Sequence, residues 1–167
     1  TPSPTVAPTT PVPTQAPELS VGGFVDRCYE VALGREADDA GFDYWVSLLN
    51  EGQACGSQVG YGFIFSNEYM NKETTDEQYI TDLYTLYFGR EADEAGYNYW
   101  LNILKDGATR EEVFAGFANS QEFYNLCEKY GVVSGYYSVG VPNDMQGGVN
   151  CFVARLYKVC LNRLPDM

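Results

Sequence analysis

Histidine is absent from this sequence of 167 residues. Its absence excludes catalytic systems of the Ser-His-Asp and Cys-His types and most zinc sites, because all of these depend on an imidazole. Motifs that cradle phosphates or dinucleotides are also missing. Lysine and arginine number 10 against 23 aspartates and glutamates, so that the net charge is −13. Nucleic acids and anionic membrane surfaces both attract basic residues, and we expect neither as a partner.

Long hydrophobic runs and internal prolines are lacking as well. No apolar run is long enough to cross a membrane, so we expect no membrane insertion. No proline occurs between Pro17 and Pro142. Because proline interrupts helices, a stretch of this length without it, and with little β-type alternation, favours helices.

The beginning of the chain has the opposite composition. Residues 1–17 hold six of the eight prolines, and most of the others are threonine, serine, valine and alanine. Such a segment cannot bury enough surface to fold, and it favours extended polyproline II. Pro/Thr-rich spacers of this kind are typical of the links between modules of secreted bacterial proteins. We therefore interpret residues 1–19 as an interdomain linker that follows another module.

One segment occurs twice in the sequence. LGREADDAGFDYW starts at Leu33, FGREADEAGYNYW starts 55 residues later at Phe88, and nine of the thirteen positions are identical. The likeness extends in both directions, and a third copy opens with Cys151 and breaks off at the end of the sequence. Self-similarity at such a period predicts one supersecondary unit stacked on copies of itself, and we expect the chain to be a fragment.

Apolar spacing and capping residues predict about four short helices in each copy. In the second copy, Thr75–Gln78 and Thr109–Glu112 fit capping boxes, while Ser120 is expected to cap the last helix and Gly131 to end it. The expected fold is all-α, with tandem helical repeats of about 55 residues after a disordered Pro/Thr-rich linker. Its expected parts are a linker (1–19), repeat 1 (20–75), repeat 2 (76–132), a loop with or without a short strand (133–148) and the first helix of a truncated repeat 3 (149–167).

The residues kept in both copies have structural roles in this interpretation. Glycine ends the first helix, aspartate caps the second, and tryptophan packs inward. We predict that each arginine reaches across its own copy and pairs with the glutamate of the fourth helix. The residues concerned are Arg35, Asp38, Trp45 and Glu68 in the first copy, and Arg90, Asp93, Trp100 and Glu122 in the second.

The combined motif resembles the family called domain of unknown function 4214. The shared pattern is L-G-R-x-x-D-x-x-G-x-x-Y-W, followed by a glycine and then F-x-x-S-x-E-F/Y, in two copies from Phe24 to about Val132. More distantly it is similar to the phycobilisome linker-polypeptide domain. The resemblance to the first family implies tandem helical modules of secreted and surface proteins of bacteria, including large polysaccharide-degrading enzymes, and it implies no known activity. The third copy departs from the pattern at Asn162, where the motif has glycine.

Carboxylates and cysteines offer the remaining chemistry. Asp38 and Asp93 begin predicted helices, where capping explains them better than glycosidase chemistry, so we expect no enzyme. No cofactor is expected; calcium is the alternative for the acidic clusters, although the twelve-residue calcium loop is absent. A bridge from Cys127 to Cys151 or Cys160 would join the second and third units, and we predict the pair Cys127 and Cys160.

The chain is rich in tyrosine, with 14 residues, and flat aromatic faces stack on sugar rings. Tyr29, Tyr84 and Tyr157 recur at core positions of the repeat, where packing explains them. The loop outside the repeat therefore supplies the predicted ligand contacts: Tyr136, Tyr137, Asn143 and Asp144. We expect a secreted or cell-surface, non-catalytic accessory module that binds polysaccharide or a cell-wall component. The alternative is a structural module that packs on other modules of the same chain, on partner proteins or on a surface layer, without a glycan ligand.

Overall fold

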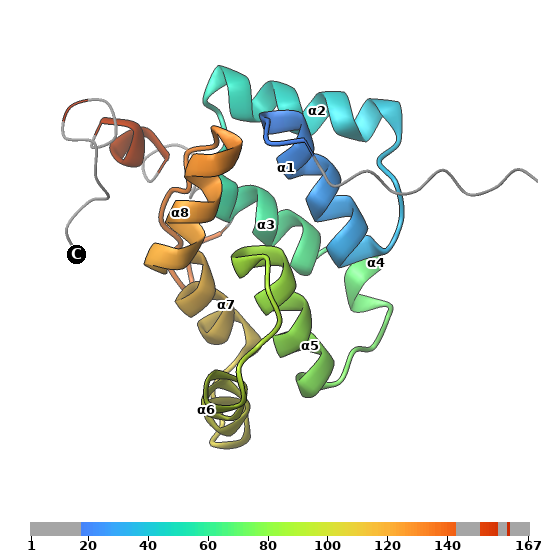
Figure 1. The fold of residues 1–167 in the computed structure, drawn as a ribbon, viewed down its shortest axis with the longest axis vertical. Coiled ribbons are helices and arrows are strands. Elements are labelled where there is room, and N and C mark those ends of the chain that lie inside the picture. Colours follow the sequence, from blue (N-terminus) through green and yellow to red (C-terminus); the bar gives the residue numbers. More distant parts are fainter. Residues whose placement is uncertain (1–17, 143–150, 157–159, 161–167) are drawn as a thin grey trace, which may run out of the picture.

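The all-α fold is confirmed by a computed structural model, which describes residues 18–142, 151–156 and 160 (Figure 1). Within these residues there is no strand, and residues 131–142 form an irregular connection. The first copy comprises α1 (Val21–Cys28), η1 (Tyr29–Leu33), α2 (Asp39–Glu51), α3 (Gly56–Ile64) and α4 (Asn67–Met70). The second comprises α5 (Asp76–Leu83), η2 (Tyr84–Phe88), α6 (Glu94–Lys105), α7 (Arg110–Ala118) and α8 (Gln121–Tyr130). Residues 151–156 are helical again.

The helix boundaries follow from the capping residues in the sequence. Thr109 and Glu112 form a reciprocal capping box at the start of α7. Thr75 and Ser120 each accept a hydrogen bond from a backbone N–H of the first turn of α5 and of α8. Gly131 ends α8 in the left-handed conformation, with φ of 71°. These side chains satisfy backbone groups that a helix end leaves without a partner.

The first helix of each copy ends in a π-helical segment, which the sequence pattern does not predict. η1 continues α1 and η2 continues α5 without a break. Each segment stops at a glycine in the left-handed conformation, Gly34 with φ of 70° and Gly89 with φ of 68°. Residues with a Cβ rarely adopt this conformation, so glycine is what allows the chain to turn before the arginine that both copies share.

The two copies pack on each other face to face. Equivalent elements meet their counterparts: α3 packs on α7, and η1 packs on η2. The first helix of each copy contacts the last helix of the other. On one side α1 packs against α8 (Figure 1), and on the other the Tyr69 hydroxyl of α4 donates to Asp82 of α5 at 2.8 Å. Contacts between equivalent elements indicate that an approximate two-fold axis relates the two copies.

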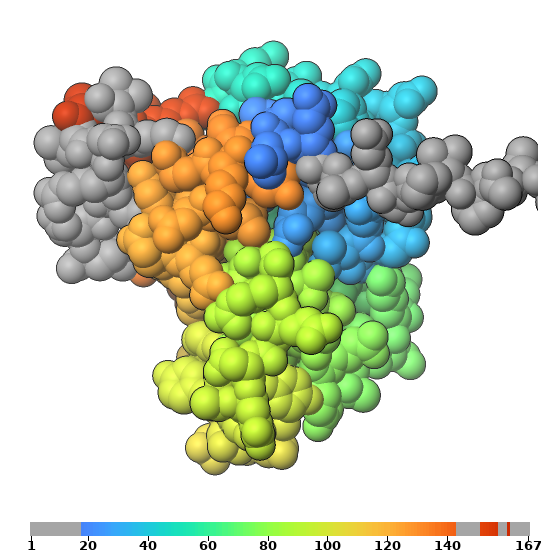
Figure 2. Space-filling model, viewed as in Figure 1, coloured from blue at the N-terminus to red at the C-terminus, as the bar shows by residue number. Residues whose placement is uncertain are grey.

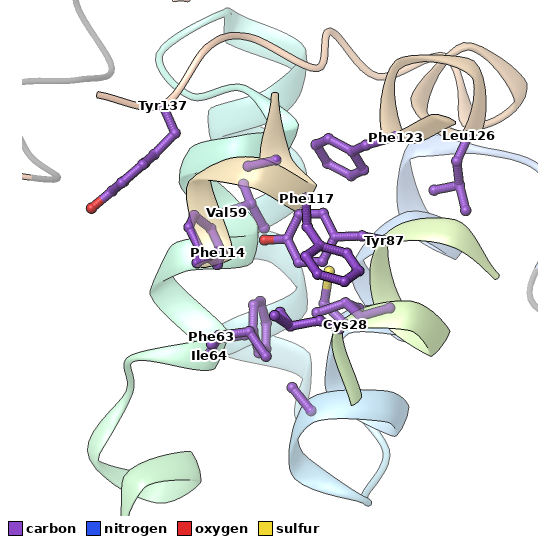
Figure 3. Packing of buried hydrophobic residues seen from close by; sticks show 14 of the residues in the cluster. Cys28, Val59, Phe63, Ile64, Tyr87, Phe114, Phe117, Phe123, Leu126 and Tyr137 are labelled. Atoms are coloured by element: carbon purple, nitrogen blue, oxygen red, sulfur yellow. The ribbon is translucent and has the colours of Figure 1, made fainter. Parts of the chain in front are cut away.

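The core lies between the copies and is rich in aromatic side chains (Figure 3). Tyr87 of η2 is buried and points toward α3, where Gly60 leaves room for it; a Cβ at position 60 would overlap the Tyr87 hydroxyl. That hydroxyl is buried without a hydrogen-bond partner. The rings of Tyr87 and Phe114 pack edge to face with centroids 5.4 Å apart. Interlocking of this kind fixes one alignment of the two copies.

The connection after α8 is tied to the helices around it. The backbone N–H groups of Gly56 and Ser57 at the start of α3 donate to the carbonyls of Val133 and Ser134 at 2.7 and 2.8 Å. These bonds satisfy N–H groups that a helix start leaves open. The connection therefore follows the surface of the helical pair instead of projecting from it.

A disulfide holds the beginning of the third copy, and it differs from the predicted one. Cys55, just before α3, is bonded to Cys151, 96 residues later. The predicted bridge between Cys127 and Cys160 is not formed, since Cys127 is buried in the core and Cys160 is an exposed thiol. The sequence pattern predicted a disulfide between the second and third copies. In the structure, the packing of the first two copies places the start of the third copy next to the first.

Candidate functional site

The thirteen-residue motif builds one cluster in each copy, centred on an arginine. Arg35 donates from Nε and Nη2 to the two carboxylate oxygens of Glu68, at 2.7 and 3.0 Å. Arg90 donates in the same way to Glu122, at 2.6 and 3.2 Å. The structure thus brings together both pairs that the repeat suggested, and each links the end of a π-helical segment to the fourth helix. Two parallel charge-assisted bonds fix orientation as well as distance.

Each arginine also lies over an aromatic ring of its own copy. The guanidinium carbon of Arg35 is 5.0 Å from the centre of the Tyr29 ring, and that of Arg90 is 5.2 Å from the centre of the Tyr84 ring. A planar cation at this distance is attracted by the face of the ring. Burial raises the pKa of both tyrosines above the ordinary value, so that they keep their protons at neutral pH.

The aspartates that both copies share cap the second helix of each copy. Asp38 accepts a hydrogen bond from the N–H of Gly41 at 2.9 Å, and Asp93 accepts one from the N–H of Gly96 at 3.0 Å. These backbone bonds, with the nearby arginines, lower the pKa of both carboxyls. A carboxylate with a lowered pKa in a cap is a poor proton donor at neutral pH, and this favours a structural role.

The tryptophans are half-buried and lie on glycines of the third helix. A Cβ at Gly62 would come within 2.8 Å of the Trp45 ring, and a Cβ at Gly116 would overlap the Trp100 ring. These four residues form two equivalent pairs, in which the missing side chain of glycine lets the indole approach the helix backbone. The arginine, aspartate and tryptophan of the motif thus all hold their own copy together.

The comparison with known families decides what these clusters belong to. The family described as "Domain of unknown function (DUF4214)" matches residues 14–73 and 61–127. The chain belongs to the DUF4214 family. No curated protein matches the sequence. The arginine clusters are therefore features of a DUF4214 unit.

In the loop that is predicted to contact a ligand, one of the predicted contact residues is buried. Tyr137 is 1% exposed and its hydroxyl donates to Glu111 at 2.7 Å, so its prediction as a ligand contact is wrong. Its backbone N–H and carbonyl are both bonded to the Asn119 side chain, and its ring stacks on Tyr61 with centroids 5.1 Å apart. An aromatic residue in a Gly- and Ser-rich segment can face the core or solvent, and here the core provides the better burial.

Of the other predicted ligand contacts, only Tyr136 lies in the described part of the chain. Tyr136 is half-buried, and residues Asn143 and Asp144 lie outside the described part of the chain. Within the described residues, no three acidic or cysteine side chains come together in a group that could hold a metal ion. In the same residues, no helix combines the length and apolar character of a membrane span.

The sequence interpretation missed two exposed tyrosines at equivalent positions. Tyr44 on α2 and Tyr99 on α6 are each 58% exposed, although both stand directly before the inward-facing tryptophan. Their rings pack edge to face on Trp45 and Trp100, with centroids 5.1 Å apart in both copies. A signal was present, because a step of one residue turns a helix by about 100° and moves a side chain off the buried face.

Proposed function

We propose that this DUF4214 chain is a non-catalytic accessory module of a secreted, multidomain bacterial protein. Its role in this proposal is to bind polysaccharide or to retain its parent protein, a carbohydrate-active enzyme, at the cell surface. The observation that carries the proposal is the pair of tyrosines, Tyr44 and Tyr99, exposed at equivalent positions on two helices. A large aromatic ring held half out of the surface is characteristic of recognition sites, where one face stays available to a ligand.

A non-catalytic role agrees with the hydrogen bonds that the carboxylates shared by both copies accept. Glu68 accepts two hydrogen bonds from Arg35, and this lowers its pKa. Asp38 is engaged by a backbone N–H in a helix cap. General acid–base catalysis requires a group whose pKa lies near the working pH, and these shifts go in the opposite direction.

Secretion is supported by the covalent chemistry of the chain. The disulfide between Cys55 and Cys151 is of the kind that forms and persists in oxidising compartments. The Pro/Thr-rich composition of residues 1–17 is that of an extended spacer between modules. Both features favour a parent protein that acts outside the cytoplasm.

A structural interaction module is the second candidate, and it rests on the helix at residues 151–156. Phe152 and Leu156 are 60% and 47% exposed, whereas the residues at the same repeat positions in the first copy, Phe24 and Cys28, are buried. Phe24 is covered by Phe123 of α8, with ring centroids 6.5 Å apart. The exposed pair is therefore an apolar surface of the type that a neighbouring unit covers inside this chain.

Affinity electrophoresis and cell fractionation separate the two candidates. The full chain is run through gels that contain a neutral β-glucan, xylan, mannan or an anionic pectin, and is also incubated with bacterial cells. We expect retardation by at least one polysaccharide, and retention on cells that the same soluble polysaccharide competes away. Migration unchanged in every gel, together with cell retention that is lost in a Phe152→Ser/Leu156→Ser variant, would establish the structural module in place of the glycan-binding one.

A further inference from the structure

The surroundings of the two exposed tyrosines are as similar as the tyrosines themselves. Four residues before each tyrosine stands an exposed alanine, and exposed side chains able to form hydrogen bonds stand one residue before it and three residues after it. We call these two surfaces the α2 platform and the α6 platform. They consist of Ala40, Asp43, Tyr44 and Ser47 on α2, and of Ala95, Asn98, Tyr99 and Asn102 on α6.

The helix geometry suits each platform to a pyranose ring. Residues three and four apart lie on the same side of a helix, and long side chains lean toward its N-terminus. The ring of Tyr44 or Tyr99 therefore leans toward an alanine, whose methyl group is too short to cover it. The C–H face of a sugar can stack on the exposed tyrosine ring. The hydroxyl, carboxylate or amide groups beside the tyrosine can form hydrogen bonds with the hydroxyls of that sugar.

Both rings are also fixed in place before any ligand arrives. Each packs edge to face on the neighbouring tryptophan, at 68° for Tyr44 and 75° for Tyr99. Each tryptophan in turn lies on a glycine of the third helix. A ring that is already held loses little conformational freedom on binding, so that even a small contact area contributes to affinity.

The charge of the molecule restricts the class of glycan. The net charge is −13, and Asp43 belongs to one platform itself, while neither platform contains a lysine or arginine. Polysaccharides rich in uronic acid or phosphate are repelled by such a surface. The ligand class that fits is a neutral polysaccharide.

The platforms lie at opposite ends of the molecule. α2 runs along the top of Figure 1 and α6 lies at the bottom, with the paired core between them along the longest axis, and Figure 2 shows the same separation in the filled surface. A strand that lies on one platform is therefore far from the other. We infer that the chain is bivalent: the α2 platform and the α6 platform each bind a separate strand of neutral polysaccharide, and one module cross-links two strands.

This inference rests on the proposed glycan binding, and two readouts keep the two claims apart. Retardation in a gel that contains soluble mixed-linkage β-glucan measures binding, and light scattering of the mixture in solution measures cross-linking. The full chain is compared with Tyr44→Ala, Tyr99→Ala and the double variant. Met70→Ala serves as a control, because Met70 is 50% exposed and lies outside both platforms. Unfolding midpoints of all variants verify that the fold is intact, as expected for exposed side chains.

We expect each single variant to keep roughly half of the retardation and to lose the increase in scattering, because one site cannot join two strands. The double variant should migrate as it does without glucan, and Met70→Ala should behave as the unchanged chain. Scattering that persists in a single variant, or retardation that persists in the double variant, overturns the bivalent assignment while leaving glycan binding in place. An unchanged chain that no glycan retards overturns both claims.

Discussion

The two copies are alike at their surface clusters and unlike where they meet. Both hold an arginine between a tyrosine ring and a glutamate with nearly the same geometry. In the interface, copy two contributes the large residues Tyr87 and Phe114, whereas copy one has Ala32 and Gly60 at the same repeat positions. Each cluster stabilises its own copy and is therefore repeated, while the interface needs two complementary halves. The two copies are therefore not interchangeable at their interface.

The largest expected effect comes from the cross-link between the first copy and the start of the third. The disulfide closes a loop with a sequence separation of 96 that contains the whole second copy. Because such a link limits the freedom of the unfolded chain, Cys151→Ala should lower the free energy of unfolding by about 2–4 kcal/mol. Urea unfolding measures this, and the exposed Cys160→Ala is the control, with no change expected. Equal stability of the two variants would contradict the disulfide.

Next in size is a change that makes the interface of copy one more like that of copy two. Gly60→Ala adds a methyl group that overlaps the hydroxyl of Tyr87, and it should cost about 1–3 kcal/mol. Adding Tyr87→Phe removes the closest atom and should recover part of the loss. A double-mutant cycle on unfolding free energies measures this coupling, and purely additive effects would show that the two side chains do not meet.

A smaller effect, of opposite sign, follows from the hydroxyl of Tyr87 itself. It is buried without a partner, so Tyr87→Phe alone should raise the free energy of unfolding by about 1 kcal/mol. The matched control is Tyr79→Phe, because the buried Tyr79 donates to the carbonyl of Arg110 at 2.7 Å and should lose stability on the same change. Thermal unfolding of both variants is decisive, and a loss in both would mean that Tyr87 has a partner.

The smallest effect concerns the clusters in which the copies agree. The hydrogen bonds from Arg35 lower the pKa of Glu68 below its ordinary value. A lowered pKa in the folded state means that the contribution to stability is present above the unfolded pKa and disappears as the pH falls through the folded one. Glu68→Gln should therefore lower the melting temperature by a few degrees at pH 7. The difference from the unchanged chain should shrink as the pH falls below ~4. A gap between Glu68→Gln and the unchanged chain that widens in acid would refute the assignment.

Much of the fold followed from local residues. Thr109, Asp38 and Gly131 act on their own helix ends, and their effect depends on the nearest few backbone groups. The repeat itself pointed from Arg35 to Glu68, because both are kept together in two copies. These features need no knowledge of how the copies lie relative to each other.

The remaining features depend on that relation and could not be predicted. The buried face of Tyr137 and the partner of Cys55 are decided by the face-to-face pairing, which brings together residues far apart in sequence. The position of Tyr44, by contrast, was within reach of the helical pattern, since it stands beside an inward-facing tryptophan.

The disulfide has a further consequence for a chain exposed to proteases. The segment between α4 and α5 connects the two copies, and its residues 71–73 are exposed. Cys55 lies before this segment and Cys151 after it. A single cut there divides the backbone but leaves both pieces in one covalent molecule, with α1 still packed on α8. A cut in this connection therefore leaves the two copies in one covalent molecule.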